Sequence, residues 1–244
     1  MFILRAELQH LAIVSWAVPS ERLAPMLPSA LEPDPIDDAG KWAIVSMAAM
    51  WDTTGHETYS QVNERAYVRK KDGTDAGAYF WKSHANSAQA ELFRWLLGIP
   101  EFNDDVEVKV PGDGTYTCTF DRRPVLQLDL GRRGPIPQSY RQKGINDQQV
   151  QRAWNMSKNP QIGYTLDWGE LCETPVRHDT IVGRAVKVRS VDPSFMVPSI
   201  TIDKDQEPIF VAYQERTPFY IALPPRPVAG WCSLLSKLFY GWRV

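Results

Sequence analysis

Cysteine is scarce in this chain, and its spacing excludes the usual structures that depend on it. The three cysteines, Cys118, Cys172 and Cys232, are odd in number, widely separated and include no Cys-x-x-Cys pair. This pattern argues against a disulfide framework and against structural zinc, and it indicates buried, reduced thiols. We therefore expect a cytoplasmic protein.

The chain also lacks an excess of charge of one sign and a long apolar stretch. Its 27 Lys and Arg residues nearly balance 29 Asp and Glu residues, so no basic field is available to hold nucleic acid or an anionic membrane. The longest apolar run, from Trp42 to Trp51, is about half the length that spans a bilayer. Arg5, Glu7 and His10 interrupt the segment where a signal peptide would need an apolar run. We expect no nucleic-acid partner and no transmembrane segment, and the balanced charge argues against a membrane partner.

Familiar metal, nucleotide and hydrolase motifs are missing as well. The sequence has no His-x-His pair and no His-Glu-x-x-His motif, so a metal site would need ligands from distant segments. Gly112-Asp113-Gly114 lacks the further glycines of a dinucleotide-binding loop, and no Gly-x-Ser-x-Gly elbow occurs. We therefore predict neither a metal nor another cofactor.

Aromatic residues and proline are abundant. Nine each of Trp, Tyr and Phe accompany 19 Pro, a mixture that favours strands with interrupted edges over a helical bundle. The 244 residues suit one mainly β domain with a few short helices. We expect strands near residues 42–50, 61–69, 77–84, 106–110, 115–120, 124–130, 162–168, 180–191 and 207–223, and helices near 86–98 and 147–155.

The predicted hairpin from Gln61 to His84 has one strongly polar face. Gln61, Asn63, Arg65 and Tyr67 alternate along its first strand and so share a face. An arginine inside a β fold can bind a carboxylate through two hydrogen bonds, while Asn63 and Tyr67 can position a carbonyl or enol oxygen. The alternative is a structural polar cluster that holds the hairpin to its neighbours.

Four segments follow one another in a characteristic order: Trp16–Asp34, Asn63–Arg69, Gly77–Trp81, and Arg94 followed by Gly98-Ile99-Pro100. Their order and spacing resemble the acetoacetate-decarboxylase-like superfamily, and most closely its branch of uncharacterised bacterial proteins. Further along, Arg177-His178 stands near the family's His-Pro-Pro-Trp segment. The resemblance implies a closed, antiparallel, cone-shaped β-barrel with an internal ligand cavity and flanking short helices, often assembled into homo-oligomers.

The resemblance does not imply that this chain catalyses acetoacetate decarboxylation. In the decarboxylases of this superfamily, the catalytic lysine follows Gly-Phe-Pro and forms a Schiff base with the substrate ketone. Here Glu101 follows Gly98-Ile99-Pro100, and a carboxylate cannot form an imine. Glu101 could act instead as a general base.

Lys82 and His84 are further catalytic candidates. By strand alternation they share a face with Ala78 and Phe80. If that face points inward, a lysine near a histidine in an apolar cavity would have a lowered pKa and could act as nucleophile or base. If it points outward, Lys82 is a solvated surface residue. The predicted catalytic residues are thus Glu101, Lys82 and His84, and the predicted substrate-binding residues are Asn63, Arg65, Tyr67 and Phe80.

The C-terminal segment has a pattern of its own. Large apolar residues recur at helical spacing, namely Trp231, Leu234, Leu235, Leu238, Phe239 and Trp242. We predict an amphipathic helix at 229–244 that packs on the domain formed by 1–228. A second subunit or a lipid interface are alternative surfaces for it.

Two functions agree with these observations. The first is an enzyme that binds a small, partly apolar carbonyl or carboxylic acid compound and catalyses lyase, isomerase or cyclase chemistry by proton transfer. The second is a non-catalytic carrier or sensor of an apolar metabolite. Titratable groups that converge on the cavity would favour the enzyme, and purely apolar walls would favour the carrier.

Overall fold

Strands make up most of the described chain. In the computed structural model, the described residues are 2–90, 92, 94, 100–131, 142, 144–167, 169–203 and 205–228. The strands are β1 (Phe2–Pro19), β2 (Leu31–Pro33), β3 (Trp42–Thr54), β4 (Glu57–Lys70), β5 (Gly77–Ala85), β6 (Glu101–Asn103), β7 (Val106–Lys109), β8 (Thr115–Phe120), β9 (Arg123–Asp129), β10 (Ile162–Asp167), β11 (Glu170–His178), β12 (Arg184–Ala185), β13 (Lys187–Val191), β14 (Phe210–Leu223) and β15 (Arg226–Pro227). The helices are α1 (Ser20–Leu23), η1 (Ala24–Met26), α3 (Asp147–Ser157) and η2 (Val197–Thr201).

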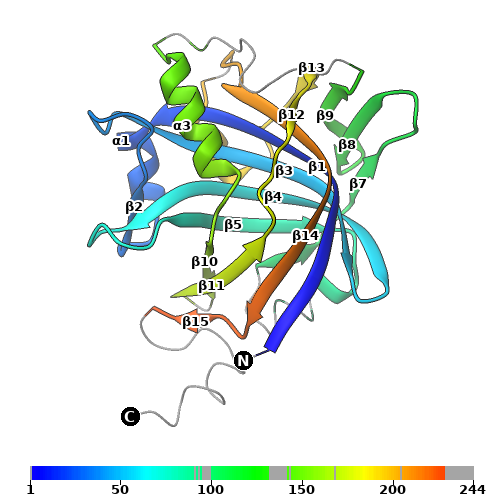
Figure 1. Ribbon diagram of the computed structural model, residues 1–244, viewed down its shortest axis with the longest axis horizontal. Coiled ribbons are helices and arrows are strands. Elements are labelled where there is room, and N and C mark those ends of the chain that lie inside the picture. Colours follow the sequence, from blue (N-terminus) through cyan, green and yellow to red (C-terminus); the bar gives the residue numbers. More distant parts are fainter. Residues whose placement is uncertain are drawn as a thin grey trace.

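Eleven strands form the main sheet, and their pairing returns to the strand from which it starts. The order β14-β1-β3-β4-β5-β10-β11 is followed by a second pairing of β11 with β14, where Val176 lies opposite Ile221. Figure 1 shows the long strands of this sheet curving together, with β14 between β1 and β11. The expectation of a wholly antiparallel sheet is wrong at β5, which pairs in parallel with both β6 and β10. A long connection that contains α3 separates β5 from β10, and a parallel pair requires such a crossover.

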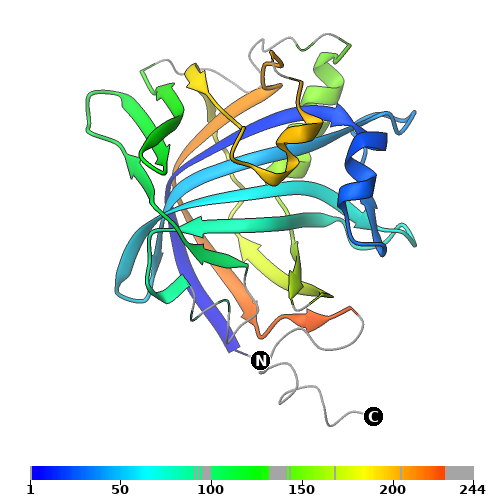
Figure 2. The same cartoon turned by 180° about the vertical axis from the view of Figure 1, so that it is seen from behind.

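The main sheet is covered on both faces. One core cluster joins Val14 and Met47 to Tyr116 and Leu126 of the second sheet, whose order is β13-β9-β8-β7. The other cluster contains Ile13, the direct neighbour of Val14, together with the buried side of α3. Burial on both faces explains the unbroken apolar run of β3, which the sequence predicted. Figure 2 shows the sheet of β7, β8 and β9 at the end of the molecule remote from α1.

The cysteine prediction is wrong in part. Cys118 is buried and free, whereas Cys172 is disulfide-bonded. Cys172 pairs with Pro227 across β11 and β15, so the end of the described chain lies beside it, and spacing along the sequence could not indicate this approach. The cysteines therefore no longer support a cytoplasmic location.

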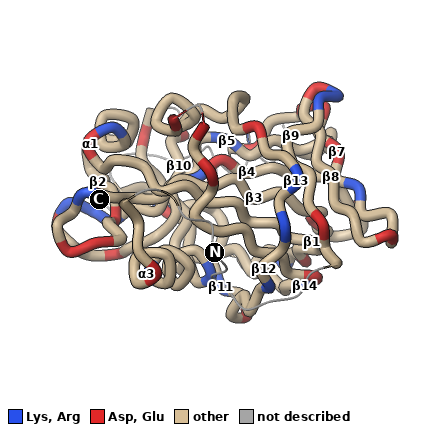
Figure 3. The backbone as a smooth tube through the Cα atoms, turned by 90° about the horizontal axis from the view of Figure 1, so that it is seen from above, with Lys and Arg blue, Asp and Glu red and all other residues tan. Residues whose placement is uncertain are grey.

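Several expectations concern residues outside the described part of the chain. The predicted helix at 229–244 lies there, as does most of the predicted helix near 86–98. The division into 1–228 and 229–244 therefore stays a prediction. Among the described residues, no helix has the length and apolar character needed to cross a membrane. Positions of Lys and Arg are interspersed with positions of Asp and Glu along the backbone (Figure 3).

A buried histidine joins three segments of the fold. His84 Nε2 lies 2.6 Å from Glu64 Oε1, and His84 Nδ1 lies 2.7 Å from Asp104 Oδ2. The second oxygen of Glu64 accepts a hydrogen bond from the backbone N–H of Val197, at 2.6 Å. Burial lowers the pKa of His84, but its hydrogen bonds with the two carboxylates outweigh this and raise the pKa above its usual value. This cluster ties β4 and β5 to the start of η2 and to the segment after β6.

We predict that His84→Gln lowers the free energy of unfolding by about 3–5 kcal/mol at pH 6, because Glu64 would remain buried without a cation. A raised folded pKa stabilises the protein fully below the unfolded pKa of about 6.5, and this stabilisation is lost as the pH rises through the folded value. The difference between wild type and variant should therefore shrink from pH 6 to pH 9 in urea unfolding. The exposed His56→Gln serves as control, and a difference that does not change with pH would contradict the ion pair.

Candidate active site

A cavity lies inside the strand circuit and is lined by residues from β1, β3, β4, β5, β6, β10, β11 and β14. It holds about 130 Å³ of free volume, which is comparable to the cavity of about 150 Å³ that binds benzene in an engineered protein. Most of its wall is apolar, with Leu8, Leu11, Met50, Phe80, Ile162, Val176, Ile181, Phe219 and Ile221. Its polar side chains are Asp52, Gln61, Asn63, Arg65, Ser83, Glu101, Thr165, Thr174 and His178.

Two bulges decide which side chains face this cavity. In β5 the register shifts so that Lys82 lies opposite Glu64 while Phe80 lies opposite Arg65. The extra residue, Trp81, reverses the alternation, so that Phe80 and Ser83 both line the cavity although they are three residues apart. A similar shift in β1, between Gln9 and Ala12, brings both Leu8 and Leu11 to the cavity.

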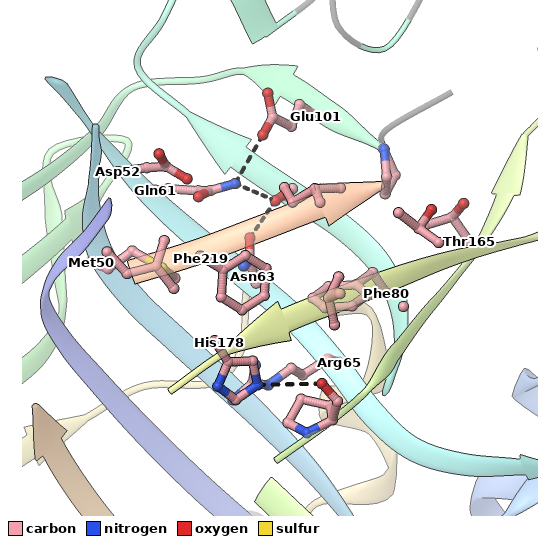
Figure 4. A pocket seen from close by; sticks show the side chains of 18 of the residues that line it. Met50, Asp52, Gln61, Asn63, Arg65, Phe80, Glu101, Thr165, His178 and Phe219 are labelled. Carbon is pink, nitrogen blue, oxygen red and sulfur yellow. Dashed lines mark hydrogen bonds between the residues drawn. The ribbon is translucent and has the colours of Figure 1, made fainter. Parts of the chain in front are cut away.

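A chain of hydrogen bonds runs along one wall (Figure 4). The Gln61 amide donates to Glu101 Oε1 at 3.1 Å and to Ser83 Oγ at 2.7 Å. The Ser83 hydroxyl in turn donates to Asn63 Oδ1. These bonds link β4, β5 and β6 and fix the position of the Glu101 carboxyl group.

Glu101 is a buried acid with one oxygen facing no partner. The residue is 5% exposed, and no described group forms a hydrogen bond with its Oε2. Burial, and next the charge of nearby Asp52, raise the pKa of Glu101 from 4.5 to about 8. Burial also raises the pKa of Asp52 to about 6, although the Thr54 hydroxyl donates a hydrogen bond to it. At neutral pH, Glu101 therefore holds a proton that it can donate.

Arg65 brings a buried positive charge to the same cavity. It is 7% exposed, and its Nε and Nη2 find no hydrogen-bond partner in the described part of the chain. Its guanidinium lies over the ring of Tyr67, 5.5 Å from the centroid. Unpaired donors on a buried cation are unfavourable, and a bound anion would satisfy them.

The structure separates the residues that the sequence grouped together. Glu101, Asn63, Arg65 and Phe80 line the cavity, and their roles in binding or catalysis stay predictions. Tyr67 does not line the cavity, and its ring lies against the Arg65 guanidinium instead.

The prediction that Ala78, Phe80, Lys82 and His84 share one face is wrong, because the bulge at Trp81 turns the last two away from the cavity that Phe80 lines. Lys82 lies over the ring of Phe102 instead, 5.6 Å from the centroid. His84 faces Phe120 and Phe195, and its ring centroid is 4.9 Å from that of Phe120.

Sequence reasoning missed six polar lining residues: Asp52, Gln61, Ser83, Thr165, Thr174 and His178. Gln61 could have been chosen, since it shares the predicted face of Asn63 and Arg65. His178 lies in the Arg177-His178 segment, and its ring stacks on Phe219 with centroids 5.1 Å apart. In the described part of the chain, no three His, Cys, Asp or Glu side chains are grouped so that they could hold a metal ion.

We predict that Glu101→Gln stabilises the protein increasingly from pH 4.5 to pH 8. The raised pKa of the buried acid means that wild type is most stable below its unfolded pKa and loses stability as the pH rises through about 8. The gain of the variant in free energy of unfolding should grow by about 1.4 kcal/mol per pH unit in this window. Asp52→Asn should show a smaller gain that levels off near pH 6. Parallel stability curves for wild type and Glu101→Gln would show that the carboxyl group is not buried as described.

One family model matches most of this chain. The family model of DUF2071, described as an uncharacterized conserved protein, matches residues 5–217. Among curated proteins, none matches the chain significantly.

Solved structures share the fold at low sequence identity. An acetoacetate decarboxylase from Legionella pneumophila superposes with a TM-score of 0.59 and 12% identity, over 93% of this chain and 87% of that one. An acetoacetate-decarboxylase-like enzyme from Sphingomonas wittichii superposes with a TM-score of 0.56 and 13% identity, over 92% of this chain and 93% of that one. The enduracididine biosynthesis enzyme MppR, complexed with pyruvate, superposes with a TM-score of 0.51 and 11% identity, over 93% of this chain and 90% of that one. The chain therefore belongs to the DUF2071 family and has the fold of the acetoacetate-decarboxylase-like superfamily.

Proposed function

We propose that this protein is an enzyme that binds a small, partly apolar carbonyl or carboxylic acid compound in its cavity and catalyses a proton transfer on it. The observation that carries the proposal is the presence of Arg65 and Glu101, both buried and both incompletely hydrogen-bonded, on the wall of one apolar cavity. Titratable groups with shifted pKa values that converge on a cavity are typical of catalytic sites. The solved relatives named as decarboxylases support chemistry of this class.

Each group has a distinct role in this proposal. Arg65 binds the carboxylate of the substrate through its free N–H groups, and the apolar wall around Phe80 and Phe219 holds the hydrocarbon part. Asp52 takes a proton from the carbon next to the carbonyl group while Glu101 donates its own proton to the carbonyl oxygen. The reverse transfers restore both groups when the reaction is complete. No lysine occurs among the described lining residues, so the proposed reaction proceeds without an imine.

The proposal has a structural part as well. We infer that the circuit of strands, closed by the pairing of β11 with β14, forms the cone-shaped barrel implied by the sequence resemblance. Assembly into a homo-oligomer and a cytoplasmic location remain predictions from the sequence.

A carrier or sensor without turnover is the second candidate function. The extent of the apolar wall favours it, because such a surface can bind an apolar metabolite without any chemistry. The two functions differ in whether the proton of Glu101 reaches the ligand.

Hydrogen exchange of linear 2-, 4- and 5-oxo acids in D₂O tests the proposal. Wild type should accelerate exchange next to the ketone for at least one of these compounds, as followed by proton NMR. Glu101→Gln should reduce this rate by about 10²-fold or more, since general acid–base groups contribute that much. Arg65→Gln should raise the concentration that gives half the maximal rate.

Lys82→Gln is the matched control, because this charged residue of β5 does not line the described cavity and should leave the rate unchanged. Binding of these compounds with no exchange above the buffer rate would reject the enzyme and favour the carrier.

A further inference from the structure

The charged groups of the cavity lie at its two opposite ends. Gln61 and Arg65 both face inward from β4, four residues apart, which corresponds to about 13 Å along a strand. Glu101 is hydrogen-bonded to Gln61, and Asp52 follows two residues after Met50, which lies opposite Gln61. Figure 4 shows Asp52, Gln61 and Glu101 together at one end and Arg65 at the other, with Phe219 between them.

Neither end is neutralised by the protein itself. Among the described residues, no cation forms an ion pair with Asp52 or Glu101, and no carboxylate forms one with Arg65. All three residues are more than nine-tenths buried. Glu101 Oε2, Arg65 Nε and Arg65 Nη2 also lack hydrogen-bond partners in the described part of the chain.

The charge balance distinguishes between classes of ligand. When one of the two carboxyl groups is ionised, the cavity contains one negative and one positive charge, which are separated by apolar side chains. A neutral ligand would leave both charges buried and unpaired, and a simple carboxylate would satisfy only Arg65. A ligand with one charge of each sign at its two ends would pair both, and unpaired buried charges are costly.

We infer that this cavity binds a zwitterion in which a short aliphatic chain separates a carboxylate, held by Arg65, from an ammonium group, held by Asp52 and Glu101. The inference rests on the proposed function, because it uses the same carboxylate site. An α-amino acid carries both charges on one carbon and would reach one end alone. An ω-amino acid of about six carbons carries its two charges at opposite ends of an extended chain, so it can reach both ends of the cavity.

Calorimetric titration of the full chain with three probes tests the inference: 6-aminohexanoate, hexanoate and hexylamine. 6-Aminohexanoate should bind at least about tenfold more tightly than either of the others, since each end group adds a buried charge pair. Asp52→Asn should remove most of its advantage over hexanoate while the affinity for hexanoate changes little. Arg65→Gln should remove most of its advantage over hexylamine.

Two controls separate binding from folding. Asp38→Asn changes a fully exposed carboxylate and should leave all three affinities unchanged. Asp52→Ser provides a second variant that removes the same charge, in case Asp52→Asn fails to give the cooperative melting curve of wild type.

The possible outcomes distinguish this inference from the proposed function. Arg65-dependent binding of hexanoate that equals or exceeds binding of 6-aminohexanoate would overturn the zwitterion and leave the carboxylate site intact. Preferred binding of 6-aminohexanoate that neither Asp52→Asn nor Asp52→Ser weakens would overturn the assignment of the ammonium site. Absence of Arg65-dependent binding for every probe would overturn both.

Discussion

The burial of incompletely paired charged and polar groups is the constraint on which the rest of this structure depends. Arg65 and Glu101 are almost fully buried, yet each keeps atoms that no described group satisfies. Such groups lower stability, and a fold retains them only where the surrounding packing is strong. Here the packing comes from a main sheet with two covered faces, and from strands whose pairing returns to its start. The resulting frame holds the two groups apart on the wall of the cavity.

Local features of the strands determine which side chains line the cavity and how they are held. The bulge at Trp81 turns Phe80 and Ser83 inward and directs Lys82 and His84 elsewhere. His84 then binds Glu64 and Asp104 on the other side of the sheet, so one strand contributes to the cavity wall and to the cluster that fixes its neighbours. The hydrogen bonds of Gln61 position Glu101 from β4 rather than from its own short strand.

Patterns that depend on regular geometry were predictable from the sequence. Strand β4 has no extra residue, so Gln61, Asn63 and Arg65 keep their predicted alternation and all line the cavity, whereas Tyr67 of the same predicted face does not. The apolar run of β3 indicated a strand buried on both faces. The position of Glu101 after Gly98-Ile99-Pro100 pointed to the cavity through the family resemblance.

Tertiary context decided the features that the sequence did not reveal. A bulge adds one residue to a strand, so the side chains beyond it point to the opposite face. No residue type around Trp81 predicts a bulge at this position. The parallel pairing of β5 with β10 and the disulfide at Cys172 both join segments that are distant in the sequence. Asp52 belongs to the site because β3 continues beyond the apolar run that was recognised.

The protonation state of Glu101 in the free protein tests the central claim most directly. The side-chain carboxyl carbons, labelled with ¹³C, can be followed by NMR from pH 4 to pH 10, and Glu101→Gln assigns the signal. A midpoint near pH 8 is predicted, because burial and the charge of Asp52 both favour the protonated acid. A midpoint near the ordinary value of 4.5 would show that Glu101 is solvated or paired, and would contradict the account.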